Sequence, residues 1–326
     1  MKFIYCISIC LLVVACRQED DLDASQVDIT ATSENEADKS KSTTSINGSS
    51  LKEDAEDLET KPLPITSTEV ADEIIQMESN VRSIKDPEQL EVYGERQQRL
   101  YRMLAKEPDL FDQVSDIVAQ EKPEYSLALE NNVFARKELF SLTNSELVGN
   151  TVPAWNLVEP VSADTLIGYY KGAEEAYGVA WEHLAAINLV ETKMGRIDGE
   201  SWAGAQGPMQ FMPATWNDCC KNMGDPTVPK DAINAAAKYL IDRGYKSKSP
   251  EVAIRGYNNS AKYVNAVTAY AEVIEDNPNT YYGYHTWGIY YLTSAGIVSL
   301  PVGYSEDEPV DIDEWLVDNP DSLVDY

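Results

Sequence analysis

The sequence predicts a mostly α-helical protein with little sheet, and three observations lead to this expectation. Apolar residues recur with helical spacing through most of the region between residues 66 and 274. Prolines stand near the starts of several of these stretches, where the first turn of a helix tolerates them. We find no convincing strand pattern and no internal repeat. The expected organisation is a helical subdomain at 66–150 and a second domain at 151–304, with acidic segments on either side.

The chain opens on a short apolar run. Lys2 precedes this run, which extends from Phe3 to Ala15 and is too short for a bilayer that needs about 20 residues. It has the length of a signal-peptide core, so residues 1–15 are expected to be removed. The run ends in Leu12-Val13-Val14-Ala15-Cys16, which resembles a bacterial lipobox. The resemblance implies lipidation at Cys16 and a membrane link through the acyl chains.

The residue after the lipobox bears on localisation. Position 17 is Arg rather than the Asp that often retains such lipoproteins at the inner membrane. This favours a cell-envelope location at the outer membrane, facing the periplasm. An ordinary signal peptide, or a membrane anchor with a chance cysteine, is the alternative.

Both ends of the remaining chain are strongly acidic. The sequence carries a formal charge of −29. Residues 17–61 hold thirteen acidic and five basic residues, and residues 305–326 hold nine acidic residues and no basic one. We expect a disordered acidic linker at 16–65 and a disordered acidic tail at 305–326. Because the sequence shows no basic patch to neutralise phosphates, it predicts no nucleic-acid partner.

The helices are predicted in order along the two domains. In the first domain, apolar residues begin to recur near Ser67, and further helices start near Pro87, Pro108 and Pro123. Two further prolines mark the domain boundary, at positions 153 and 160. In the second domain, helices are expected near Asp164–Tyr177, Trp181–Met194, Thr215–Met223, Asp231–Arg243, Pro250–Tyr257 and Ala261–Ile274.

One carboxyl group occupies an unusual position on the predicted helix Trp181–Met194. Glu191 falls in the same helical face as four apolar residues, namely Ala180, Leu184, Ile187 and Met194. Gly195 is a natural residue to end this helix. Burial and the negative end of the helix dipole both disfavour a charged carboxylate, so the pKa of Glu191 is expected to be raised. A raised pKa suits a general acid. A solvated glutamate in the last turn of a surface helix is the plainer alternative.

A glycine-rich loop follows this helix. Gly199, Gly204 and Gly207 allow backbone conformations closed to other residues and let a ligand approach closely. Gln206 and Gln210 carry amides that donate and accept hydrogen bonds, as sugar hydroxyls require. Such residues are also common in ordinary turns. The loop alone is therefore weak evidence for a binding site.

Four motifs stand in a fixed order and together resemble a known family. They are Val190-Glu191-Thr192 with Gly195-Arg196, the loop from Ala203 to Pro213, the segment from Asp231 to Leu240, and Gly256-Tyr257-Asn258-Asn259. From about residue 166 to residue 271, the chain resembles the lytic transglycosylases, lysozyme-like enzymes that cut bacterial peptidoglycan. The first motifs are most similar to the membrane-bound B type. The resemblance implies a lysozyme-like catalytic domain at 151–304.

The resemblance also implies a mechanism with one carboxyl group and no cofactor. Glu191 would protonate the glycosidic oxygen between N-acetylmuramic acid and N-acetylglucosamine, and would then act as a base toward the muramyl C6 hydroxyl. That hydroxyl attacks C1 and gives a 1,6-anhydro end without water. Tyr257 would hydrogen-bond the catalytic carboxyl group, and Gln210 would bind the glycan. The other expected substrate-binding residues are Ser201, Gln206 and Asn258.

The chain departs from the family pattern at several places. Thr192 replaces the serine that follows the catalytic glutamate in soluble members, although it keeps a hydroxyl group. The segment from Asn222 to Pro226 lacks the alternating oxygen ligands of a calcium loop, so we expect no calcium. The only histidines, His183 and His285, leave little material for a catalytic triad or a histidine metal site. Cys219-Cys220 is expected to be a local structural pair, whose bonding the sequence leaves open.

Two other functions are kept as alternatives. A hydrolytic muramidase would need a second carboxylate, which Asp198 or Glu200 would supply, although loop acids are usually exposed. A non-catalytic peptidoglycan-binding lipoprotein would need no catalytic carboxylate. Five large residues are possible sugar platforms but are more often core residues: Trp202, Met209, Phe211, Trp216 and Tyr263.

Overall fold

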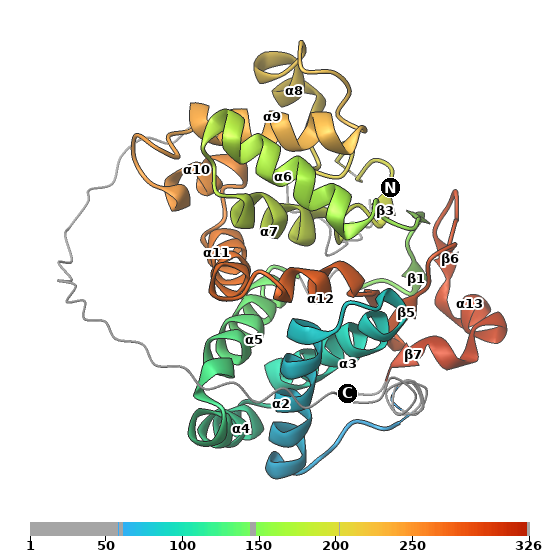
Figure 1. Cartoon of the computed structure of the whole chain (residues 1–326). Helices are drawn as coiled ribbons and strands as arrows, with labels where there is room; N and C mark the ends of the chain where they lie inside the picture. Colours follow the sequence, from blue (N-terminus) through green and yellow to red (C-terminus); the bar gives the residue numbers. More distant parts are fainter. Residues whose placement is uncertain (1–57, 59–60, 144–147, 202, 325–326) are drawn as a thin grey trace, which may run out of the picture.

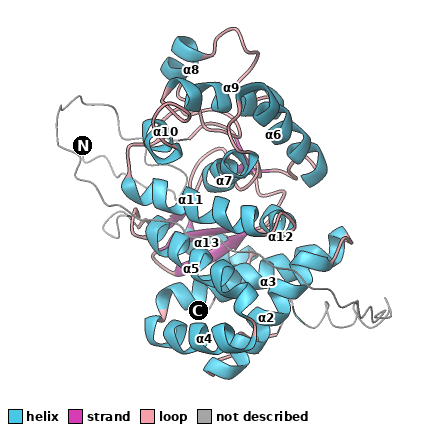
Figure 2. Ribbon diagram, turned by 60° about the vertical axis from the view of Figure 1, so that its left-hand side comes forward, coloured by secondary structure: helices cyan, strands magenta, loops and turns pink. Residues whose placement is uncertain are grey.

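The computed structural model describes residue 58 and residues 61–143, 148–201 and 203–324. Within these ranges the protein is mostly helical, as the sequence predicts, and its strands are short (Figures 1 and 2). Residues 1–57 contain the predicted signal peptide, Cys16 and most of the predicted linker, and they lie outside the described residues. No helix in the described ranges is long and apolar enough to cross a membrane.

The first helical layer forms the lower part of Figure 1. It comprises α2 (Ser67–Ser83), α3 (Pro87–Lys106), α4 (Pro108–Glu121), the 3₁₀ turn η1 (Pro123–Tyr125) and α5 (Ser126–Phe140). The predicted helix starts near Pro87 and Pro108 are confirmed, and Pro123 begins the 3₁₀ turn that leads into α5. Helix α2 is fixed by a capping box, in which the Thr66 side chain and Glu69 satisfy each other's backbone N–H groups.

The second helical layer carries the residues of interest. It comprises α6 (Ala163–Tyr177), α7 (Trp181–Thr192), α8 (Pro213–Cys219), α9 (Pro229–Asp242), α10 (Pro250–Tyr257), α11 (Ala261–Asp276) and α12 (Thr280–Thr286). Helix α7 lies between α6 and α11 in Figure 1, and it also contacts α9 and α12. Helix α11 packs along both α5 and α7, while α12 packs on α2 and α3. The two layers therefore share one hydrophobic core, which runs from α2 to Trp287.

Three small antiparallel sheets lie at one side of the helices. The largest pairs β4 (Ile289–Thr293) with β5 (Gly296–Leu300) in the register Ile289↔Leu300, and β5 with β7 (Leu323–Val324). The other two pair β1 (Thr151–Val152) with β6 (Val310–Asp311), and β2 (Asn156–Leu157) with β3 (Ile197–Asp198). The β4–β5 hairpin was not predicted from the sequence, although alternate residues of β4 are buried.

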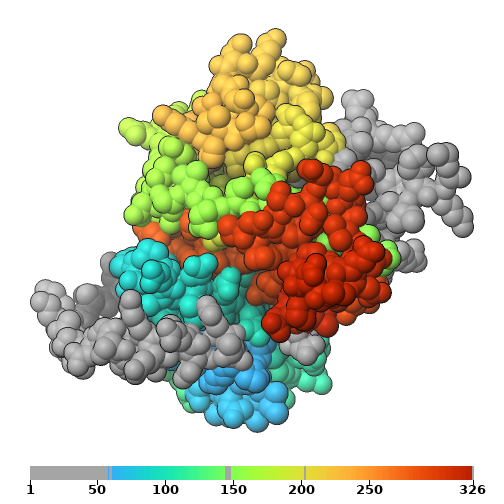
Figure 3. Space-filling model, turned by 90° about the vertical axis from the view of Figure 1, so that its right-hand side faces the viewer, coloured from blue at the N-terminus to red at the C-terminus, as the bar shows by residue number. Residues whose placement is uncertain are grey.

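The prediction of a disordered acidic tail at 305–326 is wrong for the described residues of this segment. They form β6, α13 (Ile312–Asp318), the 3₁₀ turn η3 (Pro320–Ser322) and β7. Ile312 and Trp315 are buried in a second apolar cluster with residues of β1, β2, β4 and β5. Figure 3 shows this segment in red, packed on the rest of the chain. Burial of these two side chains offsets the repulsion among the acidic residues around them.

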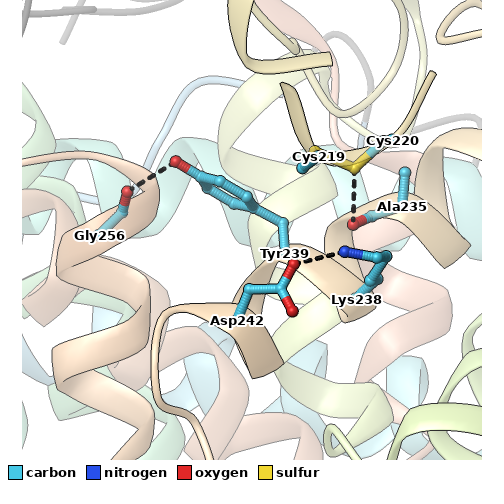
Figure 4. The surroundings of a disulfide bond; sticks show 7 residues. All are labelled: Cys219, Cys220, Ala235, Lys238, Tyr239, Asp242 and Gly256. Atoms are coloured by element: carbon cyan, nitrogen blue, oxygen red, sulfur yellow. Dashed lines mark hydrogen bonds and ion pairs between the residues drawn. A yellow bond between two sulfur atoms is a disulfide. The ribbon is translucent and has the colours of Figure 1, made fainter. Parts of the chain in front are cut away.

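The cysteine pair is bonded and lies at the end of α8. Cys219 and Cys220 form a disulfide, and Cys220 Sγ lies 3.8 Å from the Ala235 carbonyl oxygen on α9 (Figure 4). In the same region, the Tyr239 hydroxyl donates to the Gly256 carbonyl at 3.2 Å. These contacts attach α8 and the end of α10 to α9, and the end of α10 carries Tyr257.

Candidate active site

Glu191 lies in the last turn of α7, inside the protein. The residue is 1 % exposed. Every residue from Leu184 to Thr192 is buried, so α7 is a central helix surrounded by protein. The predicted burial of Glu191 is confirmed, but a single apolar stripe is not the reason for it. The helix also ends earlier than predicted, because Lys193 and Met194 adopt left-handed conformations with φ of 52° and 62°.

The two oxygens of the Glu191 carboxyl group have different surroundings. The Tyr263 hydroxyl, at the start of α11, donates to Oε1 at 2.6 Å. Oε2 is buried and has no hydrogen-bond partner in the described part of the chain. An unpartnered buried carboxylate oxygen is costly, whereas a protonated one can donate its hydrogen to a ligand. The carboxyl group therefore has one oxygen hydrogen-bonded by the protein and one buried oxygen that the described residues leave without a partner.

The electrostatics of the site favour the protonated acid. Burial raises the pKa of Glu191 to about 8, while the Tyr263 hydrogen bond and the Lys193 charge lower it. Desolvation thus outweighs the two groups that favour the carboxylate. At neutral pH most molecules would hold a proton on Glu191, which is the state that a general acid requires.

In the structure, the tyrosine that donates a hydrogen bond to the Glu191 carboxyl group is Tyr263 and not Tyr257. The Tyr257 hydroxyl has one proton, and it donates this proton to the Met209 carbonyl at 2.6 Å. The expectation that Tyr257 bonds the catalytic carboxyl is therefore wrong for this structure. Burial raises the pKa of Tyr257 most, and the Glu191 charge raises it further. Tyr257 is therefore close enough to Glu191 to sense its charge. Its neighbour Asn258 is the C-cap of α10 and is nearly buried.

Thr192 connects the end of α7 to the glycine-rich loop. Its hydroxyl donates to the Pro208 carbonyl at 2.8 Å and lies 3.1 Å from Asn188 Oδ1. The same hydroxyl accepts from the Gly195 N–H at 3.0 Å. The hydroxyl that the threonine keeps is thus used to hold the loop against the helix, directly beside Glu191.

The loop is a tight structure built on its glutamines and glycines. Gln206 and Phe211 exchange two backbone hydrogen bonds, and the Gln210 side-chain amide donates to the Gly207 carbonyl at 2.8 Å. Gln210 is buried, with φ of 48°. Its amide nitrogen therefore supports the loop. The hydroxyl of Ser201 accepts from the Ala205 N–H at 3.0 Å and likewise closes a turn.

Gly207 is required by the close approach of another segment. Its φ is +69°, and a Cβ at this position would lie 1.9 Å from the carbonyl oxygen of Pro226. No other residue type fits there without moving backbone. Gly204 also has a positive φ, of +83°, but a Cβ there would meet no atom within 4 Å. The sequence identified both glycines, and the structure distinguishes their roles.

The two loop acids lie in exposed positions. Asp198 Oδ2 accepts from the Asn156 amide at 3.3 Å, and Glu200 Oε1 accepts from the Gln206 amide at 2.6 Å. Both residues are exposed. Neither has the sheltered environment of Glu191.

The large residues proposed as sugar platforms are mainly core residues. Met209, Phe211, Trp216 and Tyr263 are all buried. Phe211 packs edge-on against Trp216, with 5.3 Å between ring centroids, and also against Tyr257 at 5.8 Å. Trp202 lies outside the described residues. The contact of Tyr263 with Glu191 was not predicted from the sequence. Ser260, three residues before Tyr263, is the N-cap of α11 and signals only the start of the helix.

Comparison with known proteins adds one finding. Residues 168–278 match the family model described as the transglycosylase SLT domain. No curated protein and no solved structure matches the chain. The matched segment contains α7 with Glu191, the glycine-rich loop and Tyr263. It supports a peptidoglycan-cleaving function of the lytic transglycosylase type, with peptidoglycan as the bound substrate.

Proposed function

We propose that this protein is a lytic transglycosylase that cleaves the β-1,4 bond between N-acetylmuramic acid and N-acetylglucosamine and leaves 1,6-anhydro ends. The observation that carries the proposal is the state of Glu191. Its carboxyl group is buried, its pKa is raised to about 8, and Oε2 has no partner within the described chain. This acid lies in the segment that matches the transglycosylase model.

The first step uses Glu191 as an acid. Because Oε1 accepts from Tyr263, we place the proton on Oε2, where it can be donated to the glycosidic oxygen. The bond between that oxygen and muramyl C1 breaks as the proton arrives. The Glu191 carboxylate that forms is then stabilised by the Tyr263 hydrogen bond and the Lys193 charge. Both groups favour the charged form and so assist the step that creates it.

The second step uses the same group as a base. The Glu191 carboxylate takes the proton of the muramyl C6 hydroxyl, and the C6 oxygen forms a bond to C1. The proton taken from C6 restores the acid, so no water is consumed and no second carboxylate is needed. Asp198 and Glu200 are exposed and accept from side-chain amides, and the proposed mechanism uses neither of them.

The remaining site residues are assigned by their positions around Glu191. We infer that Gln210, Gln206 and Ser201 bind hydroxyl groups of the glycan. Tyr257 is proposed as a positioning residue, because its hydroxyl donates to the Met209 carbonyl within the glycine-rich loop. Asn258, at the end of α10, is proposed to contact the glycan.

The sequence motifs support finer proposals about class and location. The similarity around Val190-Glu191-Thr192 favours the membrane-bound B type of transglycosylase. The lipobox favours removal of residues 1–15 and lipidation at Cys16, with the protein attached to the outer membrane on its periplasmic side. Metabolic labelling with a radioactive fatty acid would test the anchor, and a Cys16→Ser variant that is labelled as strongly as the wild type would contradict it.

Digestion of purified peptidoglycan tests the proposed reaction. We expect mass spectrometry to find 1,6-anhydro-muramyl products with the wild type and none with Glu191→Gln, which keeps the shape of the side chain but cannot donate a carboxylic proton. Asp198→Asn is the matched control and should keep its activity. Products with reducing muramic acid ends that take up ¹⁸O from labelled water would show a hydrolase instead. Binding without cleavage by the wild type would indicate a non-catalytic protein.

A further inference from the structure

The disulfide at the end of α8 joins two consecutive residues, Cys219 and Cys220. A disulfide stabilises a fold mainly by restricting the unfolded chain, and this effect shrinks as the closed segment becomes shorter. A bond between neighbours closes no segment beyond the peptide unit that already joins them. The pair therefore adds little to the stability of the fold, and its position has to explain its role.

The two cysteines have different surroundings. Cys219 is partly exposed, whereas Cys220 is buried. Cys220 Sγ lies 3.8 Å from the Ala235 carbonyl oxygen on α9 (Figure 4). After reduction of the bond, the Cys220 thiol can donate a weak hydrogen bond to this oxygen. The buried side of the pair can thus accommodate a reduced thiol, and the partly exposed side can meet a reductant.

The pair lies where the chain leaves α8. Cys219 is the last residue of α8, and Cys220 is its C-cap, with φ of −136° outside the helical range. The Cys220 N–H donates to the Trp216 carbonyl at 2.7 Å, and the Cys220 carbonyl accepts from the Met223 N–H at 2.8 Å. The disulfide therefore restricts the backbone at the point where the chain turns from α8 toward α9.

Helix α8 packs directly on the glycine-rich loop. Trp216 in α8 contacts Phe211 in the loop edge-on, with 5.3 Å between the ring centroids. The Trp216 N–H donates to the Met212 carbonyl at 2.9 Å, which joins the start of α8 to the end of the loop. A shift of α8 would be transmitted to the loop through this ring contact and this hydrogen bond.

The segment that follows the pair returns to the same loop. The Pro226 carbonyl lies so close to Gly207 that a Cβ on this glycine would be 1.9 Å from the carbonyl oxygen. The turn around Pro226 is fixed by the Asp225 side chain, which accepts from the Thr227 N–H at 2.8 Å. The disulfide therefore lies between two contacts with the loop, one through α8 and one through this turn.

We propose that the Cys219–Cys220 disulfide is a reversible redox switch that controls the glycine-rich loop. The bonded pair holds the chain between α8 and Pro226 in the shape that supports the loop, and reduction releases this restraint. The inference rests on the proposed function in assigning the loop to glycan binding. It predicts that the protein cleaves glycan best in its disulfide form.

The switching step is a thiol–disulfide exchange with a dithiol. One thiolate of the dithiol attacks Sγ of the partly exposed Cys219, the S–S bond breaks, and Cys220 leaves as a thiolate that takes up a proton. The second thiolate of the dithiol attacks the mixed disulfide and releases Cys219, which is also protonated. The cysteine pair gains two electrons and two protons, and the dithiol becomes a disulfide. An oxidised dithiol reverses both steps.

Hydrogen exchange followed by mass spectrometry tests the switch without relying on activity. The full chain would be measured before and after treatment with dithiothreitol, and alkylation of Cys219 and Cys220 would report their reduction. The N–H groups of Gln206, Gln210 and Phe211 all bond within the loop, and they should exchange about tenfold faster in the reduced protein. The amides of α5 should be unaffected. Oxidised dithiothreitol should restore the slow rates.

A matched variant separates this pair from the other cysteines of the chain. Cys219→Ser/Cys220→Ser keeps the cysteines at positions 6, 10 and 16. It should show the fast loop exchange with and without dithiothreitol, and its circular dichroism should match that of the wild type. A dithiothreitol response that persists in this variant would overturn the proposal. So would a wild-type pair that resists dithiothreitol, or one that is reduced without any change in the loop.

Cleavage assays distinguish failure of this inference from failure of the proposed function. On purified peptidoglycan, reduction of the wild type should lower kcat/KM about tenfold, and reoxidation should restore it. Equal kcat/KM for the two forms would contradict the switch and leave the proposed function unaffected. If neither form cleaves peptidoglycan but the loop exchange responds as expected, the proposed function is wrong and the coupling between the pair and the loop is supported.

Discussion

The buried state of Glu191 makes the stability of this protein depend on pH in a specific way. The pKa of this group is raised from 4.5 to about 8 in the folded protein. Below pH 4.5 the group is protonated in both the folded and the unfolded chain, and its stabilising contribution is fully present. As pH rises toward 8, the unfolded chain releases a proton that the folded chain retains. The free energy of unfolding therefore decreases. Above pH 8 both states are ionised, and the loss is complete.

The magnitude follows from the size of the shift. Each pKa unit corresponds to about 1.36 kcal/mol, so the shift costs the folded state roughly 5 kcal/mol at high pH and about 3 kcal/mol at pH 7. Glu191→Gln has nearly the same shape and never ionises. We therefore expect the variant to gain stability relative to the wild type by about these amounts as pH rises.

Urea unfolding measures this difference directly. The free energy of unfolding of wild type and Glu191→Gln would be followed by tryptophan fluorescence from about pH 4 to about pH 9.5. All other titrating groups are common to both proteins, so the difference isolates this carboxyl group. A difference that stays constant across the range would mean that Glu191 ionises at an ordinary pKa, and the reasoning about its burial would be wrong.

Three further predictions concern the surroundings of Glu191. Tyr263→Phe removes the hydrogen bond that stabilises the Glu191 carboxylate, so kcat should fall about tenfold. The alkaline limb of the pH–rate profile should move to higher pH, and an unmoved limb would contradict this role. Tyr257→Phe leaves the Met209 carbonyl without its donor, so it should lower the free energy of unfolding by about 1–3 kcal/mol in urea titrations without moving that limb. Gly207→Ala should lower the free energy of unfolding by more than about 3 kcal/mol, because the added Cβ would overlap the Pro226 backbone. Gly204→Ala should lower it by only about 1 kcal/mol. Equal losses in the two variants would show that the close approach does not matter.

The helical character of the fold was predictable because it depends on local patterns. Prolines at positions 87 and 108 begin helices in the structure as the sequence indicates. The interior position of Glu191 was also predictable, since its helical neighbours are apolar. The order of the acidic C-terminal segment was not predictable from its composition, because its buried contacts come from only two residues, Ile312 and Trp315.

Long-range contacts account for most of what the sequence did not show. Tyr263 meets Glu191 across 72 residues, and no local pattern distinguishes its hydroxyl from that of Tyr257.

Infrared difference spectroscopy tests the central claim most directly, namely that Glu191 holds its proton at neutral pH. The protein would be labelled with ¹³C at the glutamate carboxyl carbons, and spectra of wild type and Glu191→Gln would be compared at pH 7. We predict a protonated-carboxyl C=O band in the wild type that is missing in the variant and disappears as pH passes about 8. A wild-type spectrum with only carboxylate bands at pH 7 would contradict the account.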